Sequence, residues 1–142
     1  MSFGVFDRDG AVREEPVVVP RTALGGHVHG SGSGATKQDL WRHENGHKKL
    51  LNKYGVGAGA QRVYPTGDGG WAGYTNVRSW SRFDKLPIVQ QIAVYAAGGI
   101  AMGSHSHDYS DDGDIAALLR KVPWSKRRET EAAGRARARK DL

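Results

Sequence analysis

The segment from Thr36 to Gly55 constrains the fold of this chain more than any other. Thr36 and Asp39 have the spacing of a capping box, in which the hydroxyl accepts a backbone N–H and the carboxylate reaches back. Gly55 is a common terminator of a helix. Between these residues the apolar side chains recur at spacings of three and four. The pattern predicts one helix with one buried face.

Three polar residues, His43, Glu44 and His47, fall within that predicted buried face. Burying a polar group without a partner costs about 2 kcal/mol or more, so each of them needs one. Two histidines four apart on a helix project to the same side and can both reach one Zn²⁺ at about 2.0–2.1 Å. A glutamate beside them can act as a general base towards a metal-activated water. The alternative is a pair of histidines held by ordinary hydrogen bonds.

A catalytic zinc site needs a third protein ligand and one open position. The chain has no cysteine, so the ligands must be histidines or carboxylates. The candidates are His105, His107, Asp108, Asp111, Asp112 and Asp114. A carboxylate at a helix start is fixed by backbone amides, which favours Asp112 and Asp114. The pair His105 and His107 remains an alternative.

Composition and length favour one domain of mainly α-helical structure with a small β-hairpin or sheet, an α+β fold. We expect residues 1–35 to form an extended N-terminal arm, in which the segment ending at Val17–Val19 is either extended chain or an edge strand. The arm ends in a flexible glycine-rich loop, Gly25–Gly34, where His27 and His29 are expected to be surface histidines. Residues 36–123 should form the metal-binding domain. Residues 124–142 should form a basic C-terminal tail.

Inside the central domain, Gln61 to Trp80 has the composition of a β-hairpin. A second helix is expected from near Asp84 to Gly98-Gly99. A third helix should begin at Asp112 or Asp114, and Pro123 should end it.

The net charge of +6 is concentrated towards the C-terminus, where Trp124 to Leu142 holds seven basic and three acidic residues. We expect this tail to be a solvated arm or an exposed helix. Nucleic acid is the weaker alternative, because no aromatic residue follows Trp124 for base stacking. The longest apolar run, Ile88 to Gly103, is interrupted by polar residues, and Met1 to Gly10 lacks the pattern of a signal peptide. A cytoplasmic protein without a membrane segment is therefore expected.

The order of these features, from Thr36 to about Val122, resembles the peptidase domain of the FtsH-type AAA proteases. The matching segments are His43-Glu44-Asn45-Gly46-His47, Trp71-Ala72-Gly73-Tyr74-Thr75, Ile92-Ala93-Val94-Tyr95-Ala96-Ala97-Gly98-Gly99 and Gly113-Asp114-Ile115-Ala116. The resemblance implies a zincin-like fold with His43, His47 and Asp114 as zinc ligands and Glu44 as catalytic base. Asp112 is the second choice for the third ligand. The implied activity is zinc-dependent hydrolysis of peptide bonds in flexible or unfolded protein.

The chain also departs from that family. It contains no ATPase module, and Ile100-Ala101-Met102 follows the glycine pair where the family places paired glutamates. The alternative function is therefore a non-enzymatic structural or assembly protein, such as a phage virion component, that keeps the zinc site. In that case we expect a protein partner to order the N-terminal arm and the C-terminal tail, and a location in the virion.

Overall fold

The computed structural model describes residues 4–6, 12–14, 23–29, 35–103 and 109–142. The fold is mainly α-helical with small antiparallel sheets, which confirms the class expected from the sequence. The helices are α1 (Lys37–Lys53), α2 (Trp80–Asp84), α3 (Ile88–Met102), α4 (Tyr109–Leu119), the 3₁₀ helix η2 (Trp124–Lys126) and α5 (Arg127–Asp141). The strands are β1 (Gly4–Phe6), β2 (Val12–Glu14), β3 (Ala23–His29), β4 (Ala58–Pro65) and β5 (Trp71–Val77).

Helix α1 begins and ends where the sequence predicts. The Asp39 backbone N–H donates to Thr36 Oγ1 at 3.1 Å, and the Thr36 N–H donates to Asp39 Oδ2 at 2.8 Å, so the capping box is confirmed. Gly55 follows the helix with φ of 77°, a left-handed conformation that glycine adopts without steric cost. The predicted buried face is also confirmed. It consists of Leu40, His43, Glu44, Gly46, His47, Leu50 and Leu51.

The central sheet has the strand order β3-β5-β4 and is antiparallel throughout. Strands β4 and β5 form the predicted hairpin, with Val63 opposite Gly73. Strand β3 corrects the expectation of a loop over Gly25–Gly34, because its residues up to His29 pair with β5 across a bulge after Leu24. Backbone hydrogen bonds to β5 and the complete burial of Leu24 outweigh the low strand propensity of the glycines. Residues 30–34 and Val17–Val19 lie outside the described residues.

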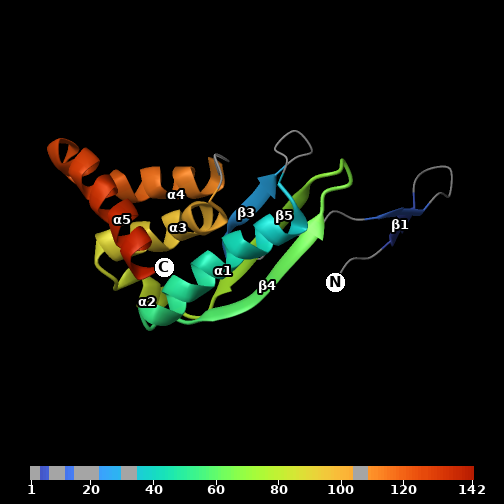
Figure 1. Ribbon diagram of the computed structural model, residues 1–142, viewed down its shortest axis with the longest axis horizontal. Coiled ribbons are helices and arrows are strands. Elements are labelled where there is room, and N and C mark those ends of the chain that lie inside the picture. The colour runs from blue at the N-terminus through green and yellow to red at the C-terminus, as the bar shows by residue number, and fades with distance from the viewer. Residues whose placement is uncertain (1–3, 7–11, 15–22, 30–34, 104–108) are drawn as a thin grey trace.

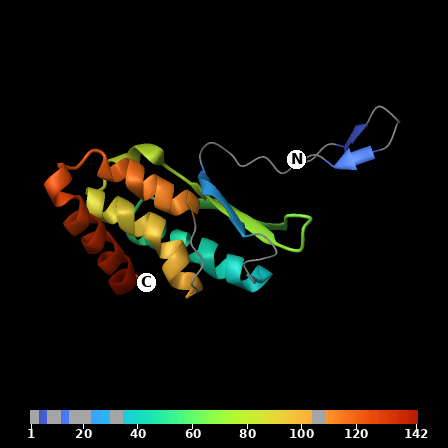
Figure 2. The same cartoon turned by 90° about the horizontal axis from the view of Figure 1, so that it is seen from above.

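Helix α3 is the central helix and packs against α1, α4 and α5 (Figures 1 and 2). The other side of α1 contacts β4 and β5, so α1 lies between the sheet and α3. The prediction that α3 ends at Gly98-Gly99 is wrong, since the helix continues to Met102 and Gly103 caps it with φ of 66°. Gly98 lies inside the helix, where the absence of a side chain permits close packing. The short helix α2 was not predicted.

Helix α4 begins at Tyr109, earlier than the expected start at Asp112 or Asp114. Its first turn therefore contains Asp111 and Asp112. The candidate ligands His105, His107 and Asp108 lie in residues 104–108, outside the described part of the chain.

The expected C-terminal tail is the helix α5, which packs along α3 (Figure 2). Gly134 and Ala138 are buried on its inner side. A Cβ atom at Gly134 would collide with the side chain of Ile92, so the two helices approach more closely than larger residues would permit. Small residues at this contact account for an ordered helix in a segment of high charge. Among the described residues, no helix is both long enough and apolar enough to cross a bilayer.

Candidate metal centre

Two histidines of α1 and one aspartate of α4 converge in the interior of the protein. His43 Nε2 lies 3.1 Å from Asp111 Oδ2, and His47 Nε2 lies 3.3 Å from the same oxygen. Both histidines are 0% exposed and Asp111 is 4% exposed. Two ligands bound to one tetrahedral zinc at about 2.0–2.1 Å lie about 3.3 Å apart. The observed separations therefore match two edges of a tetrahedral site.

The orientation of His47 is fixed by α3. His47 Nδ1 lies 2.8 Å from the backbone carbonyl oxygen of Val94. A carbonyl can only accept, so Nδ1 carries the proton and Nε2 presents its lone pair towards Asp111. A hydrogen bond from the second ring nitrogen to a carbonyl is the usual support of a metal-bound histidine.

Gly98 leaves the space in which the histidine nitrogens meet. A Cβ atom at this position would lie 2.5 Å from both His43 Nε2 and His47 Nε2. Gly46 on α1 has the matching role, because its Cβ would lie 2.5 Å from the carbonyl oxygen of Ala97. Any side chain at either position would push α3 away from α1. Glycine therefore permits α3 to approach the imidazoles closely.

Glu44 is 0% exposed and points towards the sheet. Its carboxylate Oε1 accepts a hydrogen bond from Thr75 Oγ1 at 2.8 Å, and Gly73 leaves room for Oε2. The Glu44 backbone carbonyl accepts from Gln61 Nε2 at 2.7 Å. Glu44 does not belong to the group of three converging ligand atoms, all of which lie within 4.8 Å of one another. The β4–β5 hairpin thus holds the Glu44 carboxylate beside the three converging ligand atoms rather than among them.

The third member of this group is Asp111, whereas the sequence favoured Asp114. Because α4 begins three residues before Asp112, Asp111 already lies in its first turn and faces α1. Asp112, the second choice, is directed to α5, where its Oδ1 lies 3.3 Å from Arg135 Nη2. Asp114 lies near Tyr95: burial raises the pKa of the Tyr95 phenol, and the charges of Asp114 and Asp111 raise it further. Asp111 was among the candidates, but no spacing rule distinguished it.

Two imidazole nitrogens and one carboxylate oxygen form a donor set that suits Zn²⁺. Three protein ligands leave one coordination position for water or substrate, the arrangement of catalytic zinc sites. Because His43, His47 and Asp111 come from two helices, a bound ion would also tie α1 to α4.

No family model, curated protein or solved structure matches this chain. The resemblance to the FtsH-type peptidase domain therefore depends on the sequence motifs alone.

Proposed function

We propose that this protein is a zinc-dependent metallopeptidase that cleaves flexible or unfolded protein. The observation that carries the proposal is the convergence of His43 Nε2, His47 Nε2 and Asp111 Oδ2, with Glu44 buried beside them on the same helix. Two histidines and a glutamate at these positions of one helix are the minimal set of a zincin. The buried aspartate supplies the ligand that the helix itself lacks.

A zinc ion in this site would acidify a water molecule and polarise the carbonyl group of a peptide bond. His43 and His47 would hold the ion through Nε2, and the Val94 carbonyl keeps His47 in the required tautomer. Glu44 is the general base: its carboxylate takes a proton from the attacking water and delivers it to the leaving amine. The hydroxyl of Thr75 holds one carboxylate oxygen, which fixes the direction of the other.

Burial of the site restricts the substrate. The side chains of His43, Glu44 and His47 have no exposed surface, so a folded protein surface cannot reach them. We therefore restrict the proposed substrate to an extended peptide segment, for which the elements around the site would have to open. The proposed substrates are therefore segments that are already flexible or unfolded.

The same burial favours a second candidate function, a structural zinc site in an assembly protein. A structural site takes a fourth protein ligand in place of water, and the ion then stabilises the fold directly. Asp111 comes from a different helix than the histidines, so an ion would act as a cross-link between α1 and α4. Under this alternative Glu44 is only a buried acid paired with Thr75.

Metal analysis combined with the Glu44→Gln variant separates the two functions. We expect about one zinc per chain in both proteins, because Glu44 is not a ligand. Hydrolysis of casein or of an unfolded peptide should fall by about 10²–10⁴-fold in the variant, as is typical on removal of a general base. Glu129→Gln, the same change at an exposed residue of α5, is the matched control and should keep full activity. Equal activity in wild type and Glu44→Gln would refute the mechanism, and zinc without activity in either would establish the structural alternative.

A further inference from the structure

The net positive charge of this protein comes from its last 23 residues. Residues 120–142 contain nine basic and three acidic residues, a net charge of +6. The whole chain also has a net charge of +6, so the preceding 119 residues are neutral in sum. The excess of positive charge therefore belongs to the C-terminal helix α5 and the turn before it. Concentrated charge of one sign is the electrostatic footprint of a polyanion-binding surface.

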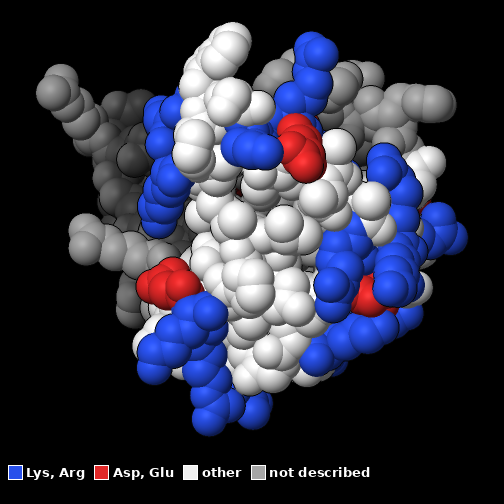
Figure 3. Space-filling model, turned by 90° about the vertical axis from the view of Figure 1, so that its left-hand side faces the viewer, with Lys and Arg blue, Asp and Glu red and all other residues white. Residues whose placement is uncertain are grey.

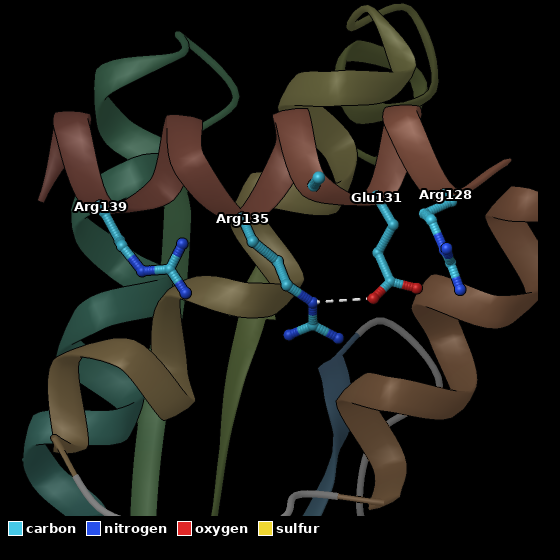
Figure 4. Close-up of a pocket in the computed structure, with 5 residues that line it drawn as sticks. Arg128, Glu131, Arg135 and Arg139 are labelled. Carbon is cyan, nitrogen blue, oxygen red and sulfur yellow. Dashed lines mark hydrogen bonds and ion pairs between the residues drawn. The ribbon is translucent and has the colours of Figure 1, made fainter. Parts of the chain in front are cut away.

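Three arginines of α5 form one continuous stripe. Arg128, Arg135 and Arg139 are separated by seven and four residues, which places them on the same side of a helix. With Glu131 and Ala132 they line a groove of about 460 Å³. Figure 4 shows the labelled side chains leaving α5 towards the same side. We call Arg128, Arg135 and Arg139 the arginine stripe.

Two members of the arginine stripe make no ion pair within the part of the chain that the structure describes, namely Arg128 and Arg139. Arg135 is the exception, since its guanidinium contacts Glu131 at 3.1 Å and Asp112 at 3.3 Å. Arg128 and Arg139 are both exposed. Lysine and arginine side chains predominate over acidic ones on the end of the molecule shown in Figure 3. The stripe therefore has guanidinium groups available for an external anion.

An exposed tryptophan stands at the N-terminal end of the stripe. Trp124 is 83% exposed and begins the 3₁₀ helix that leads directly into α5. Its ring is therefore accessible to an external ligand. Basic residues flank it in the sequence at Lys121 and Lys126. An aromatic ring within a basic surface is the combination that binds unpaired bases and their phosphates.

We propose that the arginine stripe and Trp124 together bind single-stranded nucleic acid without sequence preference. Arg128 and Arg139 are eleven residues apart, about 16 Å along the helix. That length corresponds to about five stacked nucleotides at about 3.4 Å each. Arg128 and Arg139 contact phosphates near the two ends of this segment, for which the planar guanidinium is well suited. Trp124 stacks on one base, and only an unpaired base exposes its face for that contact.

The composition of the surface argues against a membrane or a protein as the binding partner. A helix that lies in a membrane needs a face of several large apolar residues. The inner side of α5 is instead formed by Gly134 and Ala138, which pack on α3, and its exposed apolar residues are alanines. A protein interface needs a buried apolar centre, which a single tryptophan beside a charged groove does not supply.

The test measures binding of a fluorescein-labelled 20-nucleotide oligo(dT) by anisotropy, with Trp124 fluorescence as a second signal. We expect micromolar affinity at about 50 mM salt and quenching of the tryptophan, as in other non-specific complexes. The logarithm of the binding constant should fall with the logarithm of salt concentration with a slope of about −1.4, since Arg128 and Arg139 neutralise two phosphates at about −0.7 each.

Variants locate the site. Arg128→Glu with Arg139→Glu should weaken binding at least about tenfold, because two phosphate contacts become repulsive. Lys48→Glu with Lys49→Glu on α1 changes the net charge equally at exposed positions and should leave binding within about twofold. Trp124→Ala should weaken binding about 5- to 150-fold and abolish quenching. Arg135 is left unchanged because it contacts Asp112, the neighbour of Asp111.

Three results would overturn the proposal: no binding at 50 mM salt, equal losses in the two double-charge variants, or unchanged affinity of Trp124→Ala. Tighter binding to poly-glutamate or to phosphatidylserine vesicles than to the oligonucleotide would also overturn it and would assign the surface to a protein or a membrane. Circular dichroism of each variant confirms that a loss of binding is not a loss of fold. The proposal is independent of the metal site, so the His43→Ala variant should bind the oligonucleotide as the wild type does.

Discussion

The interior of the protein around α1 and the outer side of α5 both carry clustered polar residues, in opposite environments. His43, Glu44 and His47 have no exposed surface, and contacts from α3, α4 and β5 fix their positions. Arg128 and Arg139 of the arginine stripe are exposed to solvent. The first cluster lies among the main packing contacts of the domain, whereas the second lies on a helix that packs through a different side, formed by Gly134 and Ala138.

This difference determines how each region should respond to change. Charges in a buried cluster interact strongly because water does not screen them. Removing one of them leaves the others buried without a partner. Exposed charges are screened by salt and contribute little to stability. Substitutions around His43 should therefore alter stability and metal content together. Substitutions in the arginine stripe should alter ligand binding and leave the fold unchanged.

Removal of the metal should have the largest effect and should involve only the buried cluster. Chelation with EDTA is expected to lower the melting temperature of the zinc-loaded protein by more than about 10 °C, because a tightly bound ion stabilises only the folded state. The Arg128→Glu, Arg139→Glu variant should show the same decrease. His43→Ala should show none, since it binds no zinc. A melting temperature that EDTA leaves unchanged in the wild type would break the contrast between the two regions.

The neighbouring glycines of α3 provide a more local test. Gly98→Ala should destabilise the protein by about 1–3 kcal/mol and weaken zinc binding, because its Cβ would lie 2.5 Å from both histidine nitrogens. Gly99 has no atom within 4 Å of the corresponding position. Gly99→Ala should therefore stabilise the helix by about 0.5–1 kcal/mol. Urea unfolding and zinc titration of both variants measure the difference, and equal destabilisation would show that Gly98 has no special role.

The sequence predicted those parts of the structure that depend on local patterns. The capping box at Thr36 and the spacing of the apolar residues determined α1 and its buried face. Those patterns correctly placed His43, Glu44 and His47 together in the interior. Turn residues between two strand-like segments likewise predicted the hairpin of β4 and β5.

The remaining features depend on contacts between distant segments. Strand β3 exists because β5 offers it hydrogen bonds, although its glycines alone suggest a loop. Position 98 in α3 is a glycine because the histidines of α1 occupy the space where a side chain would extend. This glycine therefore does not mark the end of the helix. The position of Asp111 beside the two histidines depends on where α4 lies relative to α1, which the residues around it do not signal. A candidate ligand from another helix cannot be selected by spacing along one helix.

The smallest expected effect concerns the inner side of α5. Asp141 is 7% exposed, and hydrogen bonds from the Tyr54 hydroxyl and from Arg137 lower its pKa to about 2. A carboxyl group whose pKa is lower in the folded state stabilises the protein above its ordinary pKa of 3.8 and loses that contribution as the pH falls towards about 2. Asp141→Asn should therefore lower the free energy of unfolding at neutral pH. The difference from wild type should shrink below about pH 4. A difference that stays constant between pH 7 and pH 3 would contradict this assignment.

The zinc content of two aspartate variants tests most directly the claim that the buried cluster is a metal site with Asp111 as its third ligand. Both proteins would be purified in parallel, loaded with zinc, dialysed against metal-free buffer and measured by mass spectrometry of the metal. Asp111→Ala should lose the ion, because its Oδ2 lies within 3.3 Å of both histidine nitrogens. Asp114→Ala should retain about one zinc per chain. Full zinc content in Asp111→Ala, or its loss only in Asp114→Ala, would contradict the account.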